Sequence, residues 1–166
     1  MKFDQEDRYF IKIHFLSEGE TKLNKSVLEK TGCAVMLSEF TFDQLLDFHL
    51  AYTIFGRDED NIILFSDYDK DASFAYVEHG QIESVAAVRI QSKTPIIYFL
   101  GNVEFRNLAV LTLMASRALK KKKYTELVLC VNSKSVADTL KKILGNRVEM
   151  LSHVENFKEE LWKQIL

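Results

Sequence analysis

The chain has 166 residues, 47% of them hydrophobic and 28% charged, and a formal net charge of -2. One domain spanning 1–166 is expected at this length, with a core that needs no disulfide or metal. The small net charge predicts no general attraction to nucleic acid. The first ten residues are charged and no apolar run is long enough to cross a membrane, so we expect a cytoplasmic protein without a membrane partner.

The two cysteines, Cys33 and Cys130, are far apart in the sequence and show no CxxC or Cys/His spacing. Both lie in apolar runs, which favours buried free thiols. The four histidines share no i, i+4 or HxH spacing, so the sequence predicts no metal site of that kind.

Residues 9–16 alternate apolar and polar side chains, a pattern typical of a half-buried strand. Residues 21–30 predict a short helix that ends at Gly32. The apolar residues 33–37 predict a second strand.

A longer helix is predicted from Thr41 to about Phe55. Thr41 is an N-cap candidate and Gln44 follows three residues later, which is the capping-box spacing. The apolar side chains of this helix recur at helical spacing and are expected to face the core. They are Phe42, Leu45, Leu46, His49 or Leu50, and Ile54.

From residue 62 onwards, short apolar runs alternate with tight turns. Connections this short force neighbouring strands to be antiparallel, so the sequence predicts a meander. The expected strands are 62–65, 74–77, 82–90 and 96–100.

The stretch 94–131 predicts a strand, a helix over 103–121 and a second strand over 127–131. A strand-helix-strand unit this short implies parallel strands and a right-handed crossover. The lysines at 120–123 are expected to form a solvated helix end, where cations are favourable. Overall the sequence predicts an α/β (α+β) fold: a mixed central sheet with an antiparallel meander followed by a β-α-β-α unit.

The last elements predicted are a helix over 133–144, a strand over 147–151 and a terminal helix from about residue 157. Ser133 lies at the start of the first of these helices, where capping explains it without any nucleophilic chemistry.

An acidic stretch from Asp67 to Glu78 has the spacing D-x-D-x-D with a final Glu, which fits an EF-hand calcium loop except for Ala72 at the glycine position. Such a loop needs a helix on each side. Here a predicted strand precedes the stretch and a turn follows it, so a solvated acidic hairpin turn is the alternative interpretation.

Over residues 33–151 the order of elements resembles the GNAT-type N-acetyltransferase superfamily, and the best local match is NVEFRNLAVL, residues 102–111. In that family a loop of the form R-x-x-G-x-G or Q-x-x-G-x-A opens the central helix, whose free N–H groups bind the pyrophosphate of acyl-CoA. Arg106 matches the first position, and Ala109 and Leu111 occupy the glycine positions. The Leu111 side chain is therefore expected where the family leaves room for a phosphate.

A second register starts at Glu104 and puts Asn107 and Ala109 in the glycine positions, but it places a carboxylate beside the anion. In either register the resemblance implies acetyl-CoA or another acyl-CoA as substrate, bound in the gap between the strands of Tyr98 and Val128. The residues expected to form this site are Leu100, Asn102, Arg106, Asn107, Leu108, Ala109, Val110 and Leu111. On the following helix, Lys141 occupies the position of the family's proton-donating tyrosine.

Three hypotheses remain open. The chain is an N-acyltransferase acting on a small-molecule or protein amine, or a catalytically inactive GNAT-like scaffold that senses acyl-CoA or binds a protein, or an unrelated α/β domain. A homo-oligomer is compatible with each. The N-terminal extension, about 1–32, lies outside the resemblance and is expected to add an edge strand and a helix, or a dimerisation element.

Overall fold

The structure, a computed structural model, describes residues 7–15, 25–54, 68–90, 93–101, 104–144 and 147–154. For residues 49–54 and 143–144 it describes the backbone alone. The strand predicted over 62–65 and the helix predicted from residue 157 therefore lie outside the described residues.

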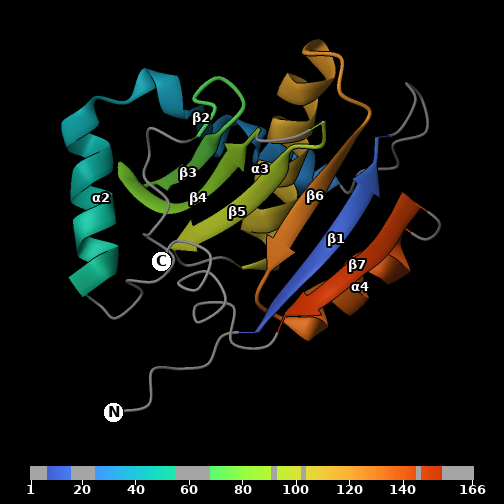
Figure 1. The fold of residues 1–166 in the computed structure, drawn as a ribbon. Helices are drawn as coiled ribbons and strands as arrows, with labels where there is room; N and C mark the ends of the chain where they lie inside the picture. Colours follow the sequence, from blue (N-terminus) through green and yellow to red (C-terminus); the bar gives the residue numbers. More distant parts are fainter. Residues whose placement is uncertain are drawn as a thin grey trace.

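One mixed sheet organises the fold (Figure 1). Its strands are β1 (Arg8–His14), β2 (Ala34–Met36), β3 (Phe74–Glu78), β4 (Gln81–Arg89), β5 (Ile96–Gly101), β6 (Glu126–Val131) and β7 (Val148–Val154). They lie in the order β2-β3-β4-β5-β6-β1-β7. The β5–β6 pair is parallel and the other pairs are antiparallel, which confirms the predicted meander, the β-α-β unit and the mixed fold class.

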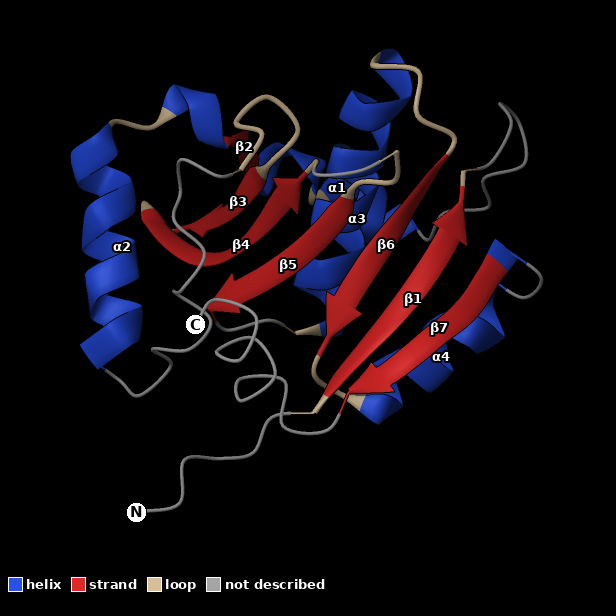
Figure 2. Ribbon diagram, viewed as in Figure 1, coloured by secondary structure: helices blue, strands red, loops and turns tan. Residues whose placement is uncertain are grey.

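Helices cover both faces of the sheet (Figure 2). The α-helices within the described residues are α1 (Lys25–Glu29), α2 (Phe42–Ile54), α3 (Phe105–Lys121) and α4 (Lys134–Leu144). Side chains of α1, α3 and α4 join a core cluster on one face, and side chains of α2 join a second cluster on the other face. No helix within the described residues is long and apolar enough to span a membrane.

The first strand lies inside the sheet. β1 is antiparallel to both β6 and β7, so the expectation of an extra edge strand is wrong. Its alternation is as predicted: Ile11 and Ile13 are buried in the core, whereas Lys12 and His14 contact Glu126 on the other face. Alternation specifies which face of a strand is apolar but not which strands become its neighbours, and this is why the position of β1 was not predicted.

The capping box at the start of α2 is confirmed. The backbone N–H of Thr41 donates to Gln44 Oε1 over 2.9 Å, and the N–H of Gln44 donates to Thr41 Oγ1 over 3.3 Å. The predicted apolar face is only partly correct: Leu45 is 3% exposed, but Phe42 and Leu46 are 69% and 36% exposed. Helical spacing identifies the apolar side chains that share one face of a helix. In α2 only part of that face is buried against the sheet.

The central helix begins two residues later than predicted and ends in a Schellman motif. The N–H of Tyr124 donates to Leu119 O over 3.1 Å, and that of Lys123 donates to Lys120 O over 3.0 Å. Lys123 has φ 71°, the left-handed conformation that glycine usually supplies at this position.

The two described elements after β6, a helix and a strand, agree with the prediction. Ser133 Oγ accepts the N–H of Val136 over 3.3 Å at the start of α4, as a helix cap does. β7 continues to Val154, three residues beyond the predicted end. Neither Cys33 nor Cys130 forms a disulfide within the described residues; Cys130 is buried and Cys33 is half-buried.

Candidate functional site

The two parallel strands separate part of the way along the sheet. The β5–β6 ladder contains three residue pairs and ends at Tyr98 and Cys130. Beyond that point β5 continues to Gly101 alongside β4, and β6 continues to Val131 alongside β1. In Figure 1 the ends of β5 and β6 diverge accordingly. Over residues 99–101, the edge of β5 that faces β6 therefore has no ladder partner among the described strands.

β5 ends at a glycine. Gly101 has φ 89°, and a Cβ built on it would lie 2.6 Å from the backbone oxygen of Glu83. No other residue fits this position without moving the backbone of β4. This turn leads the chain towards the start of α3.

The first turn of α3 has the features of a helix N-terminus that attracts anions. At this end the N–H of Leu108 donates to Glu104 O over 3.0 Å, and the N–H groups of residues 105 and 106 precede the intrahelical ladder. Such groups and the helix dipole attract negative charge. Glu104, the N-cap, is exposed and its side chain makes no capping bond, so one carboxylate already lies at this end.

Four of the eight predicted site residues have core side chains. Leu108, Val110 and Leu111 are buried between α3 and the sheet, and Leu100 is buried on the opposite face with the cluster of α2. The expectation that Leu111 fills the phosphate space is wrong, because the helix turns this side chain into the core. Asn102 lies outside the described residues.

The remaining predicted site residues differ in exposure. Asn107 is buried and Ala109 is half-buried. Arg106 is exposed and points towards β3: its Nη2 lies 3.8 Å from Glu78 Oε1. In the sheet order β3 lies on the side of β5 away from β6, so Arg106 is directed away from the strand separation.

Glu78 also accepts a hydrogen bond from a buried tyrosine. The hydroxyl of Tyr76 donates to Glu78 Oε1 over 3.0 Å. Burial, followed by this hydrogen bond, raises the pKa of Tyr76 to about 12, so the phenol stays protonated at neutral pH. Alternation along β3 could have placed Tyr76 and Glu78 on one face from the sequence, but nothing local links them to Arg106.

Tyr98 lies at the last rung before the separation, and sequence analysis gave it no role. Burial, with a smaller contribution from Cys130, raises the pKa of Tyr98 to about 12. The phenol is therefore a hydrogen-bond donor at neutral pH. Lys141, at the position of the family's tyrosine, is exposed on α4.

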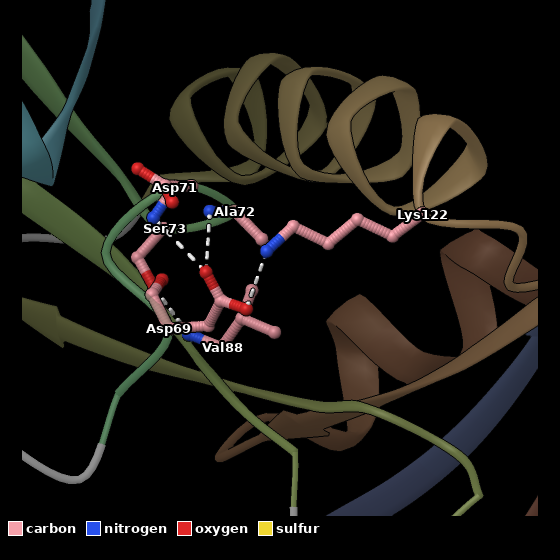
Figure 3. A network of polar contacts seen from close by, with 6 residues as sticks. All are labelled: Asp69, Asp71, Ala72, Ser73, Val88 and Lys122. Carbon is pink, nitrogen blue, oxygen red and sulfur yellow. Dashed lines mark hydrogen bonds and ion pairs between the residues drawn. The ribbon is translucent and has the colours of Figure 1, made fainter.

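A polar network at the other end of α3 occupies the proposed calcium loop (Figure 3). Asp69 Oδ1 accepts the backbone N–H groups of Asp71 and Ala72 over 3.0 and 3.2 Å. Asp69 Oδ2 accepts a hydrogen bond from Lys122 Nζ over 2.8 Å. Lys122 thus binds a carboxylate, which corrects the expectation of a fully solvated lysine run.

Ser73 completes this network. Its buried hydroxyl donates to Asp69 O over 2.6 Å and accepts the N–H of Val88 over 2.8 Å. Asp67 lies outside the described residues, and Glu78 is paired with Tyr76 as described above. Within the described residues no three His, Cys, Asp or Glu side chains are placed to hold a metal ion, so this part of the stretch forms a hydrogen-bonded turn.

No family model and no curated protein matches this chain. Among solved structures it is similar to a functionally unknown conserved protein from Staphylococcus epidermidis ATCC 12228, with 13% identity and a TM-score of 0.47. It is also similar to GCN5-related N-acetyltransferases from Sphaerobacter thermophilus (14% identity, TM-score 0.42) and Anabaena variabilis ATCC 29413 (10% identity, TM-score 0.45).

These likenesses cover 89%, 92% and 91% of this chain, but the chain spans only 59%, 52% and 39% of the lengths of those proteins.

Proposed function

We propose that this protein binds an acyl-CoA thioester where β5 and β6 part, and transfers the acyl group to an amine. The separation after Tyr98 and Cys130, directly followed by the start of α3, is the observation that supports this most. The pantetheine arm of CoA carries two amides, and an extended amide chain can pair with an unpartnered strand edge such as that of residues 99–101. The diphosphate would then meet the N–H groups of residues 105 and 106.

Tyr98 is suited to donate a hydrogen bond in this reaction rather than a proton. Its pKa of about 12 is roughly 3–4 units above that of an ordinary thiol, so protonating a departing thiolate would be uphill by about 4–5 kcal/mol. As a donor to the thioester oxygen, the same phenol would stabilise the charge that develops during acyl transfer.

A second candidate function is binding without turnover, in which the chain senses acyl-CoA or presents a binding surface. Two observations favour it: Glu104 puts a carboxylate at the start of α3, and Lys141 is exposed. A carboxylate there weakens the binding of any anion, which favours the form of this candidate that presents a binding surface. An exposed lysine lacks the water-excluded setting that catalysis uses.

Thermal unfolding with acetyl-CoA and longer acyl-CoAs tests both candidates. Ligand at 100 to 1,000 times its Kd should add about 3–4 kcal/mol of apparent stability. A shift together with thiol release in the presence of an amine panel supports the transferase. A shift without thiol release supports the acyl-CoA sensor. No shift with any thioester contradicts the transferase and the sensor, and leaves only the form of the second candidate that presents a binding surface.

The position of the site can be tested separately with Phe105→Glu. Phe105 is 38% exposed at the first position of α3, where a carboxylate stabilises a helix but repels an anion. We expect weaker acetyl-CoA binding without loss of fold. Leu151→Glu, at an exposed position on β7, is the matched control and should bind as the wild type does.

A further inference from the structure

Glu78, Tyr76 and Arg106 form a charged corner beside the start of α3. Arg106 is 48% exposed and Glu78 is 29% exposed, with 3.8 Å between Nη2 and Oε1. Tyr76 is fully buried and donates to the same carboxylate oxygen over 3.0 Å. The carboxylate is therefore fixed by a rigid partner on its own strand, whereas the arginine has a long and mobile side chain.

The corner also contains a buried donor without an acceptor. Ser84 is fully buried on β4, paired with Tyr76 on one side and with Gly101 on the other. Its hydroxyl has no hydrogen-bond partner among the residues that the structure describes. By alternation with Ala86, it lies on the face that α3 covers. An unsatisfied buried hydroxyl is costly, so the strand between Tyr76 and Gly101 carries an unmet hydrogen bond.

We propose that Glu78, held by Tyr76, competes with the anionic part of the ligand for Arg106, so that a diphosphate binds at the start of α3 only by taking Arg106 from Glu78. This rests on the proposed acyl-CoA site. Arg106 lies in the first turn of α3 and supplies a positive charge there. Its present partner is the carboxylate of Glu78. Glu78 is thus an affinity-determining residue that itself makes no contact with the ligand.

The experiment measures Kd by calorimetry for acetyl-CoA and for inorganic pyrophosphate, which carries the charge alone. Glu78→Gln keeps an oxygen that accepts the hydrogen bond of Tyr76 but removes the negative charge that competes for Arg106. The Kd should therefore fall about two- to fivefold, which corresponds to the free energy of a partly exposed ion pair. Arg106→Gln should weaken binding by a similar factor. Glu149→Gln, an exposed carboxylate on β7, is the control and should leave Kd unchanged.

The double variant distinguishes competition from simple repulsion. If Glu78 acts by holding Arg106, Glu78→Gln should increase the ligand affinity by less than about twofold in a protein that already carries Arg106→Gln. The inference is overturned if Glu78→Gln increases the affinity equally with and without Arg106→Gln. It is also overturned if the Glu78→Gln protein has the wild-type Kd. In both cases the proposed function stands. Absence of acetyl-CoA binding in the wild type and in Glu78→Gln overturns both.

Discussion

Lys122 Nζ lies 2.8 Å from Asp69 Oδ2, and this contact joins the end of α3 to the turn that precedes β3. The Asp69 carboxylate is already oriented by two backbone N–H groups, so the lysine meets a preformed acceptor. Lys122 is 37% exposed and Asp69 is 20% exposed, which places the pair near the surface. A pair of this kind contributes about 0.2–1 kcal/mol to the free energy of unfolding.

Replacing Lys122 with Met should lower the free energy of unfolding by up to about 1 kcal/mol at neutral pH. The hydrogen bond to Asp69 raises the pKa of Lys122 above its ordinary value of 10.5. A raised pKa gives stability that is complete below the unfolded value and lost as pH rises through the folded value. Urea unfolding of both proteins at pH 7 and above pH 11 should therefore show a difference that shrinks at high pH. An equal difference at both pH values would contradict the assignment.

Lys123→Gly should stabilise the protein by about 1 kcal/mol, because Lys123 has φ 71° at the end of α3 and glycine removes the left-handed strain. The shift of the urea midpoint measures the effect. Lys121→Gly, one position before the C-cap and still helical, is the matched control and should destabilise by a similar amount.

Gly101→Ala should destabilise by about 3 kcal/mol, since a Cβ would add both left-handed strain and a clash with Glu83 O. Gly80→Ala separates these two effects. Gly80 has φ 73° in the β3–β4 turn, but a Cβ there would meet nothing within 4 Å, so only about 1 kcal/mol is expected. Equal losses measured by chemical denaturation would show that the close approach at Gly101 is unimportant.

Ile11→Ala tests the position of β1. A fully buried isoleucine in a strand with neighbours on both sides should cost about 3–4 kcal/mol when truncated. Lys12→Ala, on the opposite face, removes one partly exposed contact with Glu126 and should cost less than about 1 kcal/mol. A small loss for Ile11→Ala in equilibrium unfolding would indicate that β1 is not part of the core.

The features that were predicted correctly from the sequence depend on interactions between residues that are close together in the chain. The capping box of Thr41 and Gln44, the cap at Ser133 and the antiparallel meander all depend on residues close together in the chain, and each is confirmed. The parallel β5–β6 pair followed from the length of the connecting segment alone.

What the sequence could not predict involves residues far apart. The contact of Lys122 with Asp69 and the corner of Arg106 with Glu78 join elements that no periodicity relates. Leu111 was assigned to a phosphate position by motif alignment, whereas the rotation of α3 places it in the core. The proposed binding residues at the start of α3 remain a prediction.

The placement of β1 between β6 and β7 also has a consequence for biosynthesis. β1 leaves the ribosome before every other described strand, and its two hydrogen-bonding neighbours are the last to be made. Pairings so distant along the chain slow folding, and until they form both edges of β1 remain a template for other chains. Until the later described strands are made, β1 therefore depends on shielding from aggregation.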